Sequence, residues 1–400
     1  MPTSPYRRLL IPIYLPSLLL SVSQQALLIL LPLYVLELEG GAAFAAVVVG
    51  LRGLGMLLFD VPAGMMVSRF GDKPSMMVGL VCMTVTGISL ALVDNLWLLT
   101  PFVILYGVGS AAWMLGRLCY MTDAFDIAER GRALSVIGGL MRLGAFAGPA
   151  IGGATAQFLG YNVAFLGAGV ASAMAMALVW AFAQNVRPDL GQRGPYLAQL
   201  IQIVNSHRRS FATAGFASLG IQLMRSGRQL FIPLFGAAVG LDAAVIGGIY
   251  SLSSALDMSL FYPAGLVMDR WGRKWLTAPA MALFAFALTL FPLVTGFYSL
   301  LGVALLLGLA NGFTAGIVMI LGADLAPQDL RGEFLGIWRL IGDLGWGGGP
   351  LLIGVLVEAV SLTAATFAVA GIGFLGLGVL VLFMEETLRS SRPKSDDGSS

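Results

Sequence analysis

Nine charged side chains lie inside long apolar stretches of this 400-residue chain, where an ionised group needs a partner. They are Arg52, Asp60, Arg117, Arg142, Arg225, Arg228, Asp257, Arg339 and Asp343. An ionised side chain that faces lipid costs at least about 2.5 to 3.5 kcal/mol near the bilayer centre, so we expect these groups to face one another or water. Carboxylates in such a setting can bind and release protons, and arginines can hold anions. The surplus of arginines over aspartates must be offset by carbonyls, water or an anionic ligand.

The apolar stretches themselves predict an all-α membrane protein. The chain is 58% hydrophobic and 11% charged, whereas an ordinary soluble domain is about 25% charged. A membrane-spanning helix needs about 20 apolar residues, and the sequence offers twelve such runs. They lie near residues 9–36, 42–67, 74–93, 96–122, 133–158, 162–184, 211–237, 243–267, 275–294, 298–322, 333–357 and 362–383. The first run is too long for a signal peptide, and Cys82 and Cys119 lie inside apolar runs, so we expect neither a disulfide nor a metal site.

Basic residues indicate how the helices are oriented. Apart from the six embedded arginines, every Lys and Arg falls at the N-terminus, in the even-numbered connections or in the C-terminal tail. The opposite connections contain acidic residues but no Lys or Arg. Because cytoplasmic connections collect basic residues, we expect both termini to be cytoplasmic. We expect an integral protein of the bacterial inner, or plasma, membrane.

The chain repeats itself at an offset of 201 residues. Pro32 and Pro233, Pro62 and Pro263, and several glycine and charged pairs share this register. The repeat predicts a bundle at 1–184, a cytoplasmic linker with a short amphipathic helix at 185–210, a second bundle at 211–384 and a disordered tail at 385–400. Since each half has six runs, both halves enter the membrane from the same side, and a pseudo-twofold axis along the membrane normal relates them.

A charged turn follows the second run of each half. The second-half turn reads Gly265-Leu-Val-Met-Asp269-Arg270-Trp-Gly272-Arg273-Lys274, and the first-half copy has Ser68 and Asp72 at the positions of Asp269 and Arg273. The turn resembles the G-x-x-x-D-R-x-G-R-K signature of the major facilitator superfamily, which implies twelve transmembrane helices in two six-helix bundles. The resemblance also implies a cytoplasmic gate built from Arg69, Gly71, Lys73, Asp123, Gly265, Asp269, Arg270, Gly272, Arg273, Lys274 and Asp324. We expect Arg69 to approach Asp123, and Arg270 to approach Asp324.

A glycine-rich element in the fifth run resembles one found in exporting, antiporter-type members of that family. It comprises Gly144, Gly148, Pro149, Gly152 and Gly153. Generic close packing of helices is the alternative interpretation. A further antiporter element, an arginine in the fourth run, is replaced by Val103.

Two polar stripes are candidates for binding a substrate. Trp113, Arg117 and Tyr120 share one helical face, and Gln222, Arg225 and Gln229 share another, with Gln24 as the repeat partner of Arg225. Core packing and internal ion pairs are the alternatives. The full set of candidate substrate contacts is Gln24, Trp113, Arg117, Tyr120, Arg142, Gln222, Arg225, Arg228 and Gln229.

We expect a secondary active transporter that works by alternating access, and not an enzyme, because the sequence lacks a nucleotide-binding loop and a His-Glu zinc pattern. Proton-coupled export of drug-like or organic-anion substrates is the leading prediction. Uptake of an organic anion by proton symport, lipid flipping and a channel are the alternatives. Asp257, Asp60 and Asp343 are the candidate proton-coupling residues, in that order of preference, and Asp343 comes last because Arg339 offers it an ordinary partner. The expected partners are a small-molecule substrate, protons and membrane lipids, and no nucleic acid. We expect no cofactor, since the proton gradient supplies the energy, and we expect a monomer.

Overall fold

A computed structural model describes residues 9–125, 127–184, 203–327 and 331–387. The first half contains a π-helical turn at Leu10–Tyr14 and helices α2 (Leu15–Glu37), α3 (Gly41–Phe70), α4 (Asp72–Leu92), α5 (Leu96–Ala124), α6 (Ile127–Leu159) and α7 (Tyr161–Phe182). The second half contains α9 (Arg208–Ser210), a π-helical turn at Phe211–Gly215, and helices α10 (Phe216–Ala238), α11 (Ala243–Trp271), α12 (Arg273–Thr289), α13 (Phe297–Phe313), α14 (Ile317–Leu325), α15 (Arg331–Ala359) and α16 (Leu362–Phe383), with a 3-10 turn at Phe291–Leu293. The amphipathic helix expected in the linker and most of the predicted tail lie outside the described residues.

Ten helical stretches in the described part of the chain are long and apolar enough to cross a membrane. The two other predicted spans correspond to α10, which carries two arginines and two glutamines, and to α12, which has 17 residues. The chain is therefore an all-helical membrane protein.

The turns that follow α3 and α11 depend on glycine. Gly71 has φ 93° and Gly272 has φ 111°, a region that L side chains rarely adopt. Both glycines end one long helix and start the next, so that the chain reverses direction within one residue. The repeat in the sequence thus produces the same sharp turn in both halves.

The tenth predicted span is broken. The sequence predicts one helix over 298–322, but α13 ends at Phe313 and α14 begins at Ile317. Gly316 lies between them in a left-handed conformation, with φ 77°. The equivalent span of the first half, α5, has Leu115 at this register and stays continuous.

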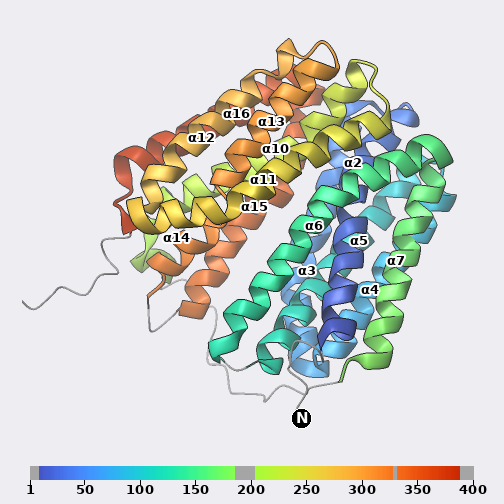
Figure 1. Ribbon diagram of the computed structural model, residues 1–400, viewed down its shortest axis with the longest axis horizontal. Coiled ribbons are helices and arrows are strands. Elements are labelled where there is room, and N and C mark those ends of the chain that lie inside the picture. Colours follow the sequence, from blue (N-terminus) through green and yellow to red (C-terminus); the bar gives the residue numbers. More distant parts are fainter. Residues whose placement is uncertain (1–8, 126, 185–202, 328–330, 388–400) are drawn as a thin grey trace, which may run out of the picture.

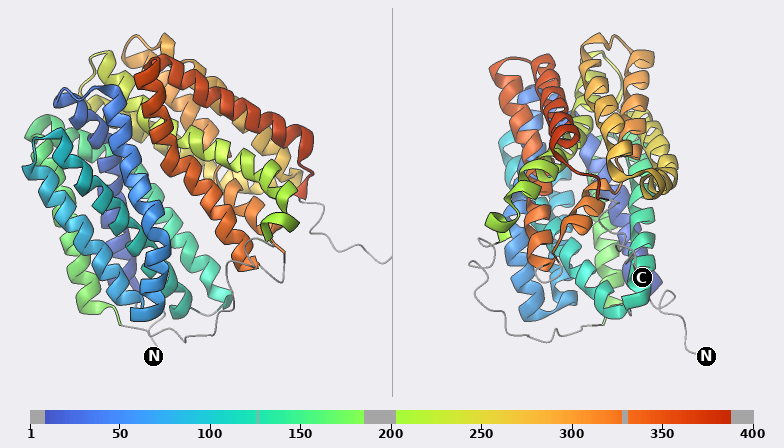
Figure 2. Two further views of the ribbon diagram at one scale, coloured as in Figure 1. Left: turned by 180° about the vertical axis from the view of Figure 1, so that it is seen from behind. Right: turned by 90° about the vertical axis from the view of Figure 1, so that its left-hand side faces the viewer.

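The helices form two groups, α2 to α7 and α10 to α16, that meet near one end of the molecule and diverge toward the other (Figure 1). Figure 2 shows the same divergence from behind. The groups meet through α6 with α11 and through α3 with α15. The domain bounds at 184 and 211 remain predictions.

Small residues hold the two groups together at the end where they meet. A Cβ atom on Gly153 would collide with the Ala243 carbonyl of α11, and one on Gly354 would lie 3.2 Å from the Ala43 carbonyl of α3. Gly153 and Gly354 are 201 residues apart, so the repeat relates the two contacts. Close backbone approach of this kind is how helices gain packing energy in a membrane.

Candidate transport site

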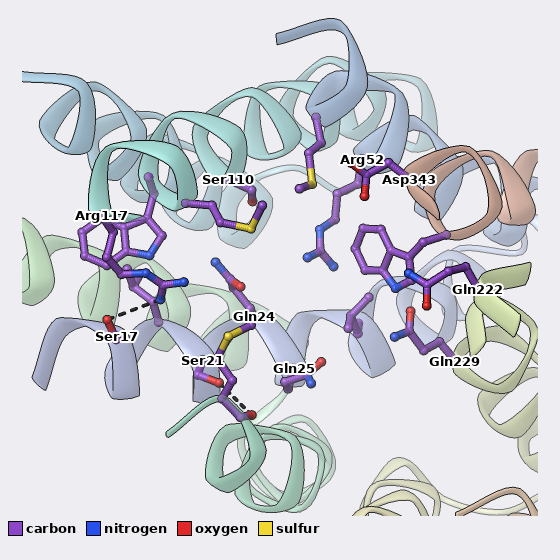
Figure 3. Close-up of a pocket in the computed structure, with 17 residues that line it drawn as sticks. Ser17, Ser21, Gln24, Gln25, Arg52, Ser110, Arg117, Gln222, Gln229 and Asp343 are labelled. Carbon is purple, nitrogen blue, oxygen red and sulfur yellow. Dashed lines mark hydrogen bonds between the residues drawn. The ribbon is translucent and has the colours of Figure 1, made fainter. Parts of the chain in front are cut away.

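A cavity of about 330 Å³ lies between the two groups of helices and is lined by both. Figure 3 shows its polar side chains pointing inward. Its lining residues are Ser17, Leu20, Ser21, Gln24, Gln25, Leu28, Arg52, Met56, Ser110, Trp113, Met114, Arg117, Met141, Gln222, Gln229, Asp343 and Trp346. Ten of these residues are polar or charged and seven are apolar. Convergent polar groups beside apolar side chains can orient and hold a small molecule.

Five of the nine predicted substrate contacts line this cavity: Gln24, Trp113, Arg117, Gln222 and Gln229. The Arg117 guanidinium lies 5.7 Å from the centre of the Trp113 ring, and its Nη1 donates to the Ser17 hydroxyl at 3.4 Å. Tyr120 is placed elsewhere, because its hydroxyl accepts the Gln184 backbone N–H. Arg142, Arg225 and Arg228 are not among the lining residues.

Three partners surround the Asp257 carboxylate. Arg142 of α6 lies 3.2 Å away, Arg228 of α10 lies 3.5 Å away, and the Asn311 side-chain amide of α13 donates to it at 2.5 Å. Only 13% of the Asp257 side chain is exposed. Arg228 belongs to the same half as Asp257, whereas Arg142 belongs to the opposite half. Asp257 therefore belongs to an ion pair within its own half and to one that joins the halves.

Arg225 instead stabilises the break between α13 and α14. Its guanidinium donates to the Asn311 side chain, to the Gln222 side chain and to the Thr314 backbone carbonyl at 2.8 to 2.9 Å. Thr314 lies within the break, where its carbonyl also accepts a long hydrogen bond of 3.3 Å from the Ile317 backbone N–H. A buried backbone carbonyl in a membrane requires such a donor, which gives Arg225 a structural role.

A second ion pair between the halves involves Asp60. Arg339 of α15 lies 3.3 Å from Asp343 on its own helix, as the four-residue spacing predicts, and 3.9 Å from Asp60 of α3. Asp60 of the first half thus has its partner in the second half. Asp343 lines the cavity, whereas Asp60 and Asp257 do not.

Lysines of the two charged turns cap neighbouring helices in the same way in both halves. The Lys73 ammonium donates to the Trp180 and Ala183 carbonyls at the end of α7, and the Lys274 ammonium donates to the Val381 and Met384 carbonyls at the end of α16. A cation at a helix C-terminus satisfies the last carbonyls and the helix dipole.

The expected pairing of Arg270 with Asp324 is wrong. Arg273, the first residue of α12, donates from Nε to Asp324 at 3.1 Å and also lies 3.5 Å from Asp269. Among the described residues, Arg270 and Arg69 form no ion pair, and Arg69 lies over the ring of its neighbour Phe70. The reason is the turn at Gly272, which reverses the chain and leaves Arg273 rather than Arg270 beside Asp324.

Asp72 occupies the position in the first half that Arg273 occupies in the second. It is 1% exposed, its Oδ2 has no hydrogen-bond partner among the described residues, and the Asp123 carboxylate repels its negative charge. The first half therefore places two acids where the second half has an arginine and an acid.

Glycines of the fifth span allow close packing on two sides. Cβ atoms at Gly144, Gly148 and Gly152 would collide with Ser21, Val22 and Ala26 of α2, and one at Gly153 would collide with Ala243 of α11. The carbonyl of Pro149 likewise lies against Gly247 of α11. These contacts support the close-packing interpretation of this element.

Arg52 is the charged lining residue, among those described, that was not a candidate site residue. It is 6% exposed, and its guanidinium lies 5.4 Å from the centres of the Tyr106 and Trp346 rings. The sequence does indicate that Arg52 lacks an ion-pair partner on its own helix, because no acidic residue lies three or four positions away.

Two groups of membrane helices that enclose a polar cavity define a transporter. The sequence matches the Major Facilitator Superfamily over residues 13–224 and 214–399. The chain belongs to this family, and it is a secondary transporter rather than an enzyme.

Relatives and solved structures agree with this assignment. The chain is 26% identical over 334 residues to the multidrug resistance protein MdtH of Yersinia enterocolitica, covering 80% of this chain and 81% of that protein. The protein of the same name in Yersinia pestis is 26% identical over 335 residues, with the same coverage. A POT family transporter solved with a thioalcohol-conjugated peptide superimposes with a TM-score of 0.77 at 12% identity, over 92% of this chain and 94% of that one. A D-xylose-proton symporter superimposes with a TM-score of 0.71 at 14% identity, over 96% of this chain and 99% of that one. The structures establish the fold alone.

Proposed function

We propose that this protein exports small molecules from the cytoplasm in exchange for protons. The multidrug resistance proteins to which the chain is similar support export. The observation that carries proton coupling is the position of Asp257, which bonds to arginines of both halves at once.

The orientation of the molecule follows from its basic connections. The turns at Gly71 and Gly272, which carry Arg69, Lys73, Arg270 and Lys274, lie at the end where the helix groups diverge. Because basic connections stay in the cytoplasm, the diverging end faces the cytoplasm and the end closed by Gly153 and Gly354 faces outward. The conformation described here is thus the one that receives a substrate from the cytoplasm.

Protonation of Asp257 would change the contact between the halves. An ionised carboxylate attracts Arg142 and Arg228, whereas a neutral one loses most of that attraction. The ion pair with Arg142 holds α6 against α11, so its loss favours a conformation in which these helices separate. A ligand or proton shifts such an equilibrium only through different affinity for the two states, and the broken ion pair provides that difference.

Transport by purified protein in lipid vesicles tests the proposal. Two probes of fixed charge, ethidium and naphthalene sulfonate, are added outside vesicles whose interior is acidic. Proton-coupled export predicts that one of them accumulates inside against its gradient, and that an uncoupler abolishes accumulation. Accumulation only when the interior is alkaline would identify proton symport, and single-channel currents in a planar bilayer would identify a channel. Either result would contradict the proposal.

A further inference from the structure

The strongest unexplained feature of the cavity is the guanidinium of Arg52. It lies about 16 Å along α3 from the start of that helix, at the depth of the bilayer centre. Its Nη1 atom is buried and has no hydrogen-bond partner in the part of the chain that the structure describes. Among the described residues, no carboxylate lies within ion-pair distance of Arg52. A buried charge without a partner is costly.

The surroundings of Arg52 offset only part of this cost. The faces of Tyr106 and Trp346 attract the cation, but stacking on an aromatic ring leaves the N–H groups of a guanidinium without acceptors. Figure 3 shows the head of Arg52 pointing into the cavity, with Gln24 on one side and Gln222 and Gln229 on the other. The guanidinium of Arg52 is therefore directed at the space that a substrate would fill.

The other charges on the cavity wall leave it positive. Arg117, the second arginine there, contacts the Trp113 ring and the Ser17 hydroxyl but forms no ion pair among the described residues. Asp343, the one acid on the wall, is bonded to Arg339, which is not a lining residue. An anion entering the cavity would meet two arginines and no acid that lacks a cation.

We infer that Arg52 binds the carboxylate of an organic anion whose aromatic body lies among Trp113, Trp346 and the apolar residues of the wall. A guanidinium donates two parallel hydrogen bonds to a carboxylate. Rings and methionines provide a complementary surface for the apolar part, since Met56, Met114, Leu20 and Leu28 also line the cavity. This inference rests on the proposed function, because it assigns a substrate class to the same cavity.

Equilibrium binding to the purified full-length protein tests the inference without transport. Calorimetry compares naphthoate with naphthamide, which has the same shape and no charge, and with naphthyl-methylammonium, which is cationic. We expect naphthoate to bind at least about tenfold more tightly than naphthamide, because a hydrogen bond to a charged group contributes roughly 1.5 to 3 kcal/mol. Arg52→Gln should remove this preference and leave naphthamide binding unchanged. The exposed Arg132 provides a matched control, and Arg132→Gln should preserve the preference.

A second variant keeps the test decisive if Arg52→Gln does not fold. Arg52→Lys keeps the charge but loses the planar pair of donors, and we expect naphthoate to bind several-fold more weakly with naphthamide unchanged. Equal binding of naphthoate and naphthamide to the wild-type protein, tighter binding of the ammonium probe, or an unaltered preference in both Arg52 variants would overturn the inference. Failure of the proposed function would look different, since naphthoate would bind but no probe would accumulate in vesicles.

Discussion

Arg142 of α6 and Asp257 of α11 form an ion pair of 3.2 Å between the two halves of the transporter. The guanidinium of Arg142 also lies 4.0 Å from the centre of the Phe261 ring, so α11 provides both of its contacts. Asp257 retains Arg228 and Asn311 as partners within its own half. Removal of Arg142 therefore weakens the contact between the halves without leaving the carboxylate unpaired.

We predict that Arg142→Gln shifts the protein toward a conformation open at the outer end. Spin labels placed at Phe158 and Val360, both exposed near the outer ends of α6 and α15, should show a longer distance in a larger fraction of molecules. The native Cys82 and Cys119 are first replaced so that only the introduced cysteines are labelled. Unchanged distance distributions in the variant would argue that the ion pair does not hold the halves together.

The close backbone contacts between the halves at the outer end should also be disrupted when a glycine there is replaced by a larger residue. Gly247 packs against the Pro149 carbonyl of the opposite half, whereas its neighbour Gly248 has no atom within 4 Å of the Cβ position. We expect Gly247→Ala to separate α6 from α11 and to reduce vesicle transport at least about tenfold, because the backbone atoms it meets are held by their helices. Gly248→Ala should transport like the wild type. If both variants behave alike, the close contact does not control the outer end.

The two charged turns should respond oppositely to loss of an acid. Asp324→Asn removes the buried partner of Arg273 and leaves it only the exposed Asp269 among the described residues, so the melting temperature should fall because a mostly buried guanidinium loses its better-shielded ion pair. Asp72→Asn removes a buried acid that has no partner and lies near Asp123, so the melting temperature should stay the same or rise. Thermal melting of both variants in one detergent decides this. A lower melting temperature for Asp72→Asn would mean that its carboxylate stabilises the turn.

Several features of this structure could be predicted from the sequence because they repeat or lie on one helix. Gly71 and Gly272 share a register and a conformation, and the pair Arg339 and Asp343 follows from helical spacing. Lys73 and Lys274 were predicted as members of the charged turns, and the structure gives both the same role as helix caps.

Contacts between helices far apart in the sequence could not be predicted in this way. The ion pair of Arg142 with Asp257 depends on how the halves meet. Trp113 and Arg117 line the cavity, but Tyr120, on the same helical face, lies too near the end of α5 to reach it. Helical spacing gives the face of a residue, but the depth of the cavity decides which part of that face lines it. Similarly, the turn at Gly272 determines that Arg273, rather than Arg270, lies beside Asp324.

Substitution of Asp257 by asparagine tests the central claim most directly. Asparagine has nearly the same shape and carries no titrating proton, and Asp242, exposed just before the same helix, provides the matched control as Asp242→Asn. Each variant is reconstituted in vesicles and measured twice, for accumulation of the transported probe driven by a proton gradient and for exchange of labelled for unlabelled probe without a gradient. We predict that Asp257→Asn loses proton-driven accumulation and keeps exchange, while Asp242→Asn keeps both. Accumulation of the probe against its gradient by Asp257→Asn, with only a proton gradient supplied, would contradict the account.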